Sequence, residues 1–173
     1  MNSAAENESA PAPRIENSQV AILLEQMAEL LEFTDENMFK VRSYRTAADA
    51  VKDLDVPIAD IAQKGGVADL QKIPGIGKSI GAQIFEIVQT GAAPLLETLK
   101  QHTPLTVLDL RKVSGIGLKT AQALFRDFGI KSLSELKVFA DGGGLRSVPG
   151  LGEKTTERVL RSLDRLLPQA DQT

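Results

Sequence analysis

Three short glycine motifs contain the residue types that could bind a phosphate group. They read Lys72-Ile-Pro-Gly-Ile-Gly-Lys78, Val113-Ser-Gly-Ile-Gly-Leu-Lys119 and Val148-Pro-Gly-Leu-Gly-Glu-Lys154. Glycine accepts backbone angles that other residues resist, so each motif predicts a tight turn between two helices. The helix after such a turn presents free N–H groups and a partial positive charge. A phosphate fits this arrangement, and a lysine follows each turn.

The spacing of the motifs predicts a repeated structural unit. Their first glycines are Gly75, Gly115 and Gly150, which are 40 and 35 residues apart. One Gly-x-Gly is common at helix turns, but three copies with the same flanks indicate a repeat. Glu153 follows the third motif directly, and Glu157 comes one turn later. Because a carboxylate there repels phosphate, packing or a protein contact is an alternative role for the third copy.

The composition limits the class of protein. Hydrophobic residues make up 42% of the 173 residues and aromatic residues only 4%, which predicts a core of Leu, Ile, Val and Ala. The absence of cysteine excludes disulfides and cysteine-based metal sites. No apolar run approaches the roughly 20 residues of a membrane span, and no secretion signal is visible. We therefore expect a soluble, cytoplasmic protein without a membrane partner, associated with the nucleoid if the source is bacterial.

The charge is negative overall but unevenly distributed. A net charge of −3 and a pI near 5.3 count against a general nucleic-acid binder, which usually carries a basic surface. Residues 72–126, however, contain seven Lys or Arg residues and only three Asp or Glu residues. A locally basic face on an acidic protein would bind a polyanion weakly and in a salt-sensitive way.

Apolar residues recur at helical spacing along most of the chain, and no strand-like alternation persists, so we predict an all-α fold. Ser18 is expected to cap the first helix, and a second helix is expected from about Phe39 to Leu54. The sequence divides into a disordered tail at 1–17, a helical domain with the first motif at 18–91, the second and third motifs at 92–168, and a frayed end at 169–173.

The motifs resemble the helix-hairpin-helix motif of DNA repair and replication proteins. The second predicted helix carries Asn37-Met-Phe-Lys-Val-Arg-Ser-Tyr-Arg-Thr-Ala-Ala48 and is followed by the first motif. This order is similar to the N-terminal region of family X DNA polymerases, the group of DNA polymerase beta and the bacterial PolX enzymes. The resemblance covers about residues 18–167. It implies tandem helix-hairpin-helix units that bind the DNA backbone through hairpin amides, without reading base sequence.

The resemblance also implies which residues form the sites. DNA contacts are implied for the start of the second helix and for the three hairpins, at Lys40, Arg42, Tyr44, Arg45, Gly75, Ile76, Gly77, Lys78, Ser79, Gly115, Ile116, Gly117, Lys119, Thr120, Gly150, Gly152 and Lys154. Hairpin carbonyls are implied as ligands of a potassium or sodium ion, at Gln71, Ile73, Ile76, Arg111, Val113 and Ile116. No other cofactor is required. A solvated basic face is the alternative for the helix residues, and a core position is the alternative for Tyr44.

Two departures from the family argue against an enzyme. The chain stops where the polymerase palm would begin, and Asp53-Leu-Asp55 stands at a helix end, so two-metal polymerisation is not expected. The family's N-terminal domain can act as a 5′-deoxyribose phosphate lyase, which needs a lysine amine to form a Schiff base. Gln83 occupies that position here, and an amide is not a useful nucleophile.

We therefore expect a DNA-binding module that acts on gapped, nicked or template–primer DNA in repair or replication. A separate repair polymerase, nuclease or ligase would be its partner. A residual lyase is one alternative, because Lys40, Tyr44 and Lys72 match supporting positions of the family. A protein-interaction scaffold, favoured by the acidic charge, is another. A fragment of a full family X polymerase is the third, although the Met start and polar end favour a complete chain.

Overall fold

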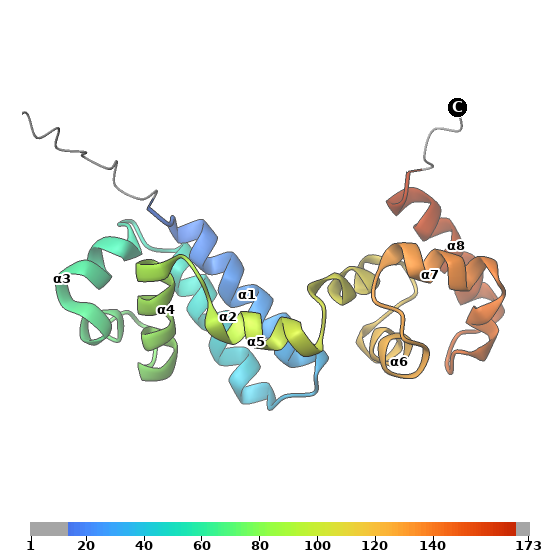
Figure 1. Ribbon diagram of the computed structural model, residues 1–173, viewed down its shortest axis with the longest axis horizontal. Coiled ribbons are helices and arrows are strands. Elements are labelled where there is room, and N and C mark those ends of the chain that lie inside the picture. The colour runs from blue at the N-terminus through green and yellow to red at the C-terminus, as the bar shows by residue number, and fades with distance from the viewer. Residues whose placement is uncertain (1–13, 169–173) are drawn as a thin grey trace, which may run out of the picture. The chain divides into compact units, whose positions relative to one another are not determined.

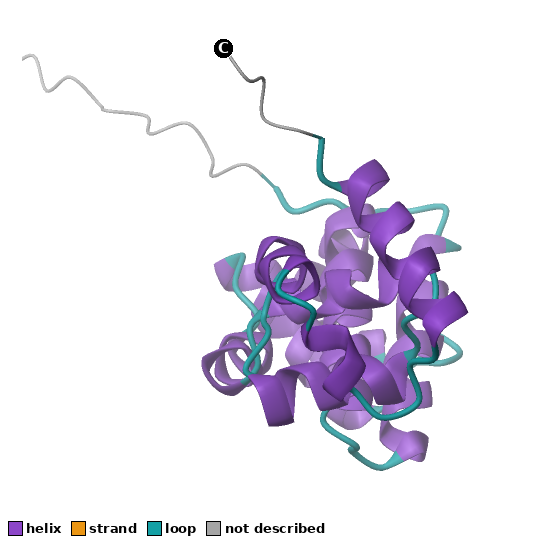
Figure 2. Cartoon of the chain, turned by 90° about the vertical axis from the view of Figure 1, so that its right-hand side faces the viewer, coloured by secondary structure: helices purple, strands orange, loops and turns teal. Residues whose placement is uncertain are grey.

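A computed structural model describes residues 14–168, and within that range all regular structure is helical (Figures 1 and 2). The all-α prediction is therefore confirmed for the described residues. The elements, in chain order, are α1 (Asn17–Phe33), α2 (Met38–Lys52), α3 (Ile58–Leu70), α4 (Lys78–Thr90), α5 (Pro94–His102), η1 (Leu105–Lys112), α6 (Leu118–Phe128), α7 (Leu133–Asp141), η2 (Gly144–Ser147) and α8 (Glu153–Leu166), where η1 and η2 are 3₁₀ helices.

The start of α1 differs from the expected one. The helix begins at Asn17, so Ser18 lies inside the helix and does not cap it. The Asn17 amide is used for a tertiary contact: its Oδ1 accepts from the Ile58 N–H at 2.7 Å, and its Nδ2 donates to the Val56 carbonyl at 2.9 Å. Most of the predicted tail at 1–17, and the whole predicted frayed end at 169–173, lie outside the described residues.

Other helix boundaries follow the glycine and proline signals. The second helix ends at Lys52, two residues before the expected end at Leu54. Helix α3 is kinked at Gly66, whose φ of 60° and ψ of −151° are not helical. Gly91 and Gly129 adopt left-handed angles directly after α4 and α6. This conformation is the usual glycine ending of a helix, which closes the last turn.

The chain folds as two compact units. The first comprises the residues up to Glu25 together with Ser43–Ala93, and the second comprises Gln26–Arg42 together with the residues from Pro94 onward. The boundary after Ala93 lies close to the predicted one at 91. The segment Gln26–Arg42, however, groups with the second unit, whereas the sequence had placed it in the first. Periodicity identifies a helix, but it does not show that the two ends of one helix can pack in different units.

Aliphatic side chains fill both cores, as the low aromatic content predicts. Leu24, Val51, Ile58, Leu70 and Ile84 are fully buried in the first unit, and Met27, Leu30, Leu110, Leu124 and Leu136 are fully buried in the second. The aromatic contacts that reinforce the second core include Phe33 with Phe125, whose ring centroids are 5.9 Å apart, and Phe128 with Phe139 at 5.1 Å.

The first glycine of each hairpin has a backbone conformation that side chains resist. Its φ is 96° at Gly75, 95° at Gly115 and 84° at Gly150. A non-glycine residue held in such a sparsely populated region costs about 1–3 kcal/mol. These three positive φ angles confirm the tight turns that the motifs predict.

Two of these glycines also lie against a helix. A Cβ atom at Gly75 would lie 3.1 Å from Thr46 Cγ2 of α2, and one at Gly115 would lie 3.0 Å from Thr155 Cγ2 of α8 and 3.3 Å from Val159. The turn therefore approaches a helix so closely that a side chain would push the two apart. Glycine is required at both positions by backbone angle and by packing.

We predict that Gly115→Ser lowers the free energy of unfolding by about 1–3 kcal/mol, through the strained φ and the contact with Thr155. Gly117→Ser is the matched control two residues away. Its φ is −91°, it is the N-cap of α6, and a Cβ there would meet nothing within 4 Å. Because serine is a good N-cap, this control should be neutral or stabilising. Urea unfolding followed by circular dichroism compares the two, and equal losses would contradict the distinction.

Candidate functional site

The second glycine of each hairpin differs physically from the first. Gly77, Gly117 and Gly152 are the N-caps of α4, α6 and α8, with φ angles of −87°, −91° and −79° that any residue adopts. A Cβ atom at any of them would meet no heavy atom within 4 Å. The fold therefore does not need glycine at these positions. The missing side chain instead leaves the start of each helix open to solvent.

No side chain caps these three helices. Each N-cap residue is a glycine, so no side chain forms a hydrogen bond to the first turn. The contrast is α7, where the Ser132 hydroxyl accepts from the Glu135 N–H at 3.2 Å. The first-turn N–H groups of α4, α6 and α8 are therefore uncapped donors with the positive end of the helix dipole behind them. This arrangement suits an anion.

The lysines that follow the hairpins differ in their partners. Within the described residues, Lys78 and Lys154 form no ion pair, and both side chains are exposed. Lys119 is 85% exposed and lies 3.7 Å from Asp35 Oδ1. Lys72, which precedes the first hairpin, pairs with Asp69 at 3.0 Å. Such exposed pairs contribute about 0–1 kcal/mol each, so an approaching phosphate can compete for these cations.

Asp35 is the acidic residue beside the second hairpin, and the sequence gave no indication of this contact. It lies in the loop before α2 with a φ of 58°, and its Oδ1 accepts from Gln122 Nε2 of α6 at 2.9 Å. Gln122 is only 5% exposed and also donates to the Phe33 carbonyl at 2.8 Å. The hydrogen bond from Gln122, and then the charge of Lys119, lower the pKa of Asp35 below its ordinary value. The ionised Asp35 carboxylate therefore competes with any ligand of the second hairpin for Lys119.

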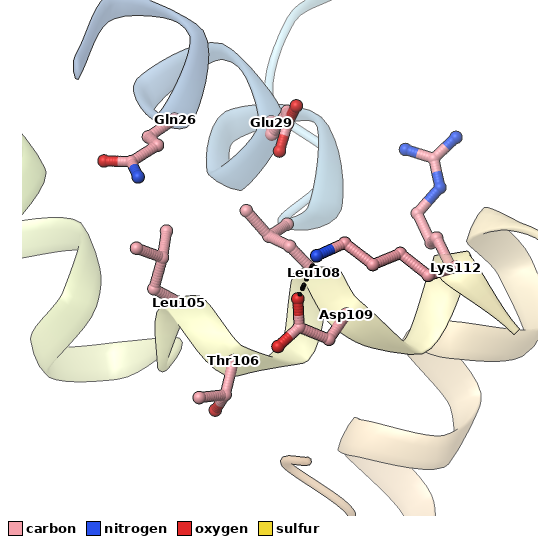
Figure 3. Close-up of a pocket in the computed structure, with 8 residues that line it drawn as sticks. Gln26, Glu29, Leu105, Thr106, Leu108, Asp109 and Lys112 are labelled. Carbon is pink, nitrogen blue, oxygen red and sulfur yellow. Dashed lines mark ion pairs between the residues drawn. The ribbon is translucent and has the colours of Figure 1, made fainter. Parts of the chain in front are cut away.

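A cavity of about 580 Å³ lies between α1 and η1 in the second unit (Figure 3). The cations of its lining are already paired: Lys112 Nζ lies 2.8 Å from Asp109, and Arg111 donates to Glu32 at 2.7 Å. The hydrogen bond to Asp109 is the main reason that the pKa of Lys112 is raised. Glu29 and Gln26 of α1 complete the opposite wall (Figure 3). The lining contains both cations and carboxylates, so its charges favour contacts between α1 and η1 over the binding of an anion.

Tyr44 is buried, which corrects its assignment as a DNA contact. Its side chain is 3% exposed, its hydroxyl accepts a hydrogen bond from Gln83 Nε2, and burial raises its pKa. A ring in the core cannot stack on a base, so the alternative core role is the one observed. Gln83 stands at the position implied for a lyase nucleophile, and its amide nitrogen donates this hydrogen bond.

The exposed aromatic residue at the start of α2 is Phe39. Its side chain is 79% exposed, and it stands between the exposed Met38 and Lys40. Lys40 lies 3.9 Å from Glu36, and Arg42 is exposed without an ion pair among the described residues. The implied basic face at Lys40 and Arg42 is therefore accessible. Arg45, which belongs to the first unit, is half-buried.

The implied cation ligands occupy equivalent places in two hairpins. The Ile73 carbonyl accepts from the Ile76 N–H at 3.1 Å, and the Val113 carbonyl accepts from the Ile116 N–H at 3.1 Å. A carbonyl oxygen has a second lone pair, so these bonds leave both oxygens able to bind a cation. Within residues 14–168 no group of three or more His, Asp or Glu side chains could hold a metal. The monovalent ion stays a prediction.

The third hairpin keeps the turn but changes the charge. The Leu151 N–H donates to the Val148 carbonyl at 3.3 Å, as in the other hairpins. Glu153, however, stands in the first turn of α8, where a carboxylate competes with an external anion.

Among the described residues, no helix is long and apolar enough to cross a membrane.

Two family models match the chain. One, described as a helix-hairpin-helix domain, matches residues 15–93, and the other, described as a SAM-like helix-hairpin-helix tandem, matches residues 107–165. The first region contains the first hairpin, and the second contains the other two. These matches confirm the predicted helix-hairpin-helix units.

Several curated proteins are similar in sequence. The chain is 29% identical over 141 residues to the DNA polymerase/3'-5' exonuclease PolX of Bacillus subtilis (strain 168), covering 82% of this chain and 24% of that protein. It is 33% identical over 114 residues to a DNA nucleotidylexotransferase of Ambystoma mexicanum, covering 65% and 21%. It is 28% identical over 117 residues to the Holliday junction branch migration complex subunit RuvA of Nitrosomonas europaea, covering 67% and 55%. The chain thus spans about a quarter or less of the first two relatives and about half of the third. The predicted resemblance to the family X N-terminal region is confirmed.

We predict that Gln122→Met and Lys119→Met each raise the pKa of Asp35, because the hydrogen bond from Gln122 is the largest single cause of the lowering and Lys119 contributes through its charge and a hydrogen bond. A lowered folded-state pKa means that the carboxylate stabilises the fold above its ordinary pKa of 3.8, and that this stabilisation is lost as pH falls through the lower folded value. Carbon-13 NMR titration of the Asp35 carboxyl measures the shifts. Exposed Gln63→Met is the control and should change nothing; an unchanged pKa of Asp35 in either the Gln122 or the Lys119 variant would contradict the assignment.

Proposed function

We propose that this chain, whose helix-hairpin-helix domains resemble the N-terminal region of family X DNA polymerases, binds the DNA backbone without reading base sequence. One observation carries the proposal. Gly77 and Gly117 begin uncapped helices, although neither their φ angles nor their packing requires glycine. Glycine has a remaining use there, which is to let a ligand approach the backbone N–H groups closely. A phosphate is the ligand that fits such donors at a helix N-terminus.

The charge distribution supports backbone binding over base recognition. Lys78 and Lys119 stand one and two residues after the second glycine of their hairpins, and both are exposed. No helix of the described residues is required to enter a groove for such contacts, because amides and lysines reach phosphates from outside. Backbone contacts position a protein on DNA but carry no sequence information. The affinity should therefore fall as salt rises and should be the same for unrelated sequences.

The finer part of the proposal concerns the DNA structure. We propose gapped, nicked or template–primer DNA in repair or replication as the substrate, with a separate repair polymerase, nuclease or ligase as the partner, in the cytoplasm or at the nucleoid of a bacterial cell. The exposed Phe39 ring, beside Lys40 and Arg42, supports this part. Aromatic rings stack on unpaired bases, and base stacking contributes about 1–3 kcal/mol. Phe39 thus takes the role that had been assigned to Tyr44.

A potassium or sodium ion belongs to the proposal as a bridge between hairpin and phosphate. The carbonyls of Gln71, Ile73 and Ile76 would hold it at the first hairpin, and those of Arg111, Val113 and Ile116 at the second. Oxygen ligands suit such hard cations, and the turn hydrogen bonds leave the Ile73 and Val113 oxygens a lone pair each. The bound ion would add positive charge where the backbone amides face the phosphate.

We predict that Gly77→Gln and Gly117→Gln each weaken binding to a fluorescein-labelled duplex about tenfold, or about 1.4 kcal/mol, because the new side chain covers the helix N-terminus. Anisotropy titrations with two duplexes of unrelated sequence should give the same loss for both. A one-nucleotide-gapped duplex with a 5′ phosphate, run beside the ungapped one, tests the finer proposal through tighter binding to the gap.

Gly142→Gln is the matched control for this experiment. Gly142 has a φ of −79°, and a Cβ there would make ordinary contacts of 3.5 Å or more, at the far end of α7. It should leave affinity unchanged. No binding by the unaltered chain at low salt would overturn the proposed function, and equal affinity of all three variants and the parent would overturn the role of the hairpins.

We also predict that the chain forms no borohydride-trapped adduct with a 5′-deoxyribose phosphate substrate. The position implied for the nucleophile is Gln83, whose amide nitrogen donates to Tyr44 and has no amine chemistry. Trapping is read as a shifted band on a denaturing gel, with a lyase of known activity as the positive control. A trapped adduct lost on Lys78→Met would show that another lysine serves as the nucleophile.

A further inference from the structure

Helix α8 carries four cations on one side. Lys154, Arg158, Arg161 and Arg165 follow one another at intervals of four, three and four residues, and all four are exposed. Residues three and four apart are neighbours on a helix surface. At about 1.5 Å of rise per residue, the row is about 16 Å long. The side of α8 defined by these four residues is called the basic row below.

The other sides of α8 account for its remaining residues. Val159, Ser162 and Leu163 are buried against the rest of the second unit. The carboxylates of Glu153, Glu157 and Asp164 lie at helical spacing on a third side, about a quarter turn from the basic row. Asp164 is paired with Lys137 of α7 at 3.3 Å. The helix therefore separates its cations from its anions and does not pair them along its length.

The basic row is free to meet an external partner. Within residues 14–168, none of its four side chains forms an ion pair, although their reach would allow pairs with the acidic side of the same helix. Three of the four are arginines, whose planar guanidinium binds phosphate through two parallel hydrogen bonds. Arg165 also has a local explanation, because a cation in the last turn interacts favourably with the helix dipole. Arg158 and Arg161, in the middle of the helix, do not.

The row is held at a fixed place relative to the second hairpin. Residues that immediately follow row cations contact that hairpin: Thr155 and Val159 pack on Gly115, and Ser162 Oγ accepts from the Ser114 N–H at 2.9 Å. Successive residues are about 100° apart on a helix, so the row runs beside the face that packs on the hairpin. Hairpin and row belong to the same compact unit.

We infer that the basic row of α8 is a second phosphate-binding surface, which contacts a further stretch of DNA backbone when the second hairpin holds the duplex. The inference rests on the proposed function. Charge complementarity selects the partner, because a strand of DNA presents one phosphate per 3.4 Å of helix axis, and the row is about as long as five such steps. Glu153 lowers the positive potential at the N-terminus of α8, and the basic row provides positive charge along the side of the same helix.

The test compares salt dependence in two double variants of equal charge. Arg158→Gln/Arg161→Gln removes the two central cations of the row, and Lys64→Gln/Lys131→Gln removes two exposed lysines elsewhere. The slope of log K against log[salt] for a 30-base-pair duplex, measured by anisotropy, should flatten by about 2 for the arginine pair, since each lost phosphate contact removes about 1 from the slope. The lysine pair should leave the slope within error of the parent.

The outcomes separate the two proposals. If the parent binds and Gly117→Gln weakens it, but the arginine pair keeps the parent slope, the inference is overturned and the proposed function stands; an acidic protein is then the partner to seek. If the parent does not bind at low salt, the proposed function itself fails. Combining Gly117→Gln with the arginine pair should weaken binding more than either change alone, because the hairpin and the row contact different phosphates. Circular dichroism melting of each variant verifies that the exposed substitutions leave the fold intact.

Discussion

The close approach of a glycine turn to a helix is the constraint on which the hairpins depend. Gly75 and Gly115 combine a positive φ with a neighbouring helix at van der Waals distance. The approach fixes the direction in which the chain leaves the turn, and two residues later the next helix begins with an open N-terminus. The first glycine therefore serves the fold, and the second leaves the helix N-terminus open, as the proposed phosphate contact requires. One short motif thus contains two glycines that only their φ angles and surroundings distinguish.

Paired carboxylates surround the second hairpin of this acidic chain. Around the second hairpin, Glu32, Asp35 and Asp109 pair with Arg111, Lys119 and Lys112. The pairs of Lys112 and Lys119 are exposed and individually weak, so they lower the local positive charge without closing the site, whereas Glu32 in the pair with Arg111 is only 10% exposed. A phosphate at the helix N-terminus gains amide hydrogen bonds that a carboxylate 3.7 Å from Lys119 does not have. The net charge of −3 thus describes the whole surface and not the hairpins.

The sequence predicted the helices and turns because those depend on local spacing. Glycine turns, helical periodicity and the family resemblance located three hairpins correctly. The signal for Phe39 was also present: it stands two residues before buried Val41, which places it on the opposite side of α2. Tyr44 lies three residues after Val41, on the buried side, which agrees with the core position given as its alternative. The contact between Asp35 and Gln122 joins residues 87 positions apart, and no local pattern encodes it.

The third hairpin shows how one unit of a repeat can change its role. Gly150 has the turn conformation of the other first glycines, but a Cβ there would meet nothing within 4 Å, so no helix presses on this turn. Its exit helix instead provides the packing partner for Gly115, through Thr155 and Val159. With Glu153 in its first turn, the N-terminus of α8 is the least suited of the three to an anion. The cations of this helix lie instead along its side, at Lys154, Arg158, Arg161 and Arg165, whose spacing of four, three and four residues places them on one face.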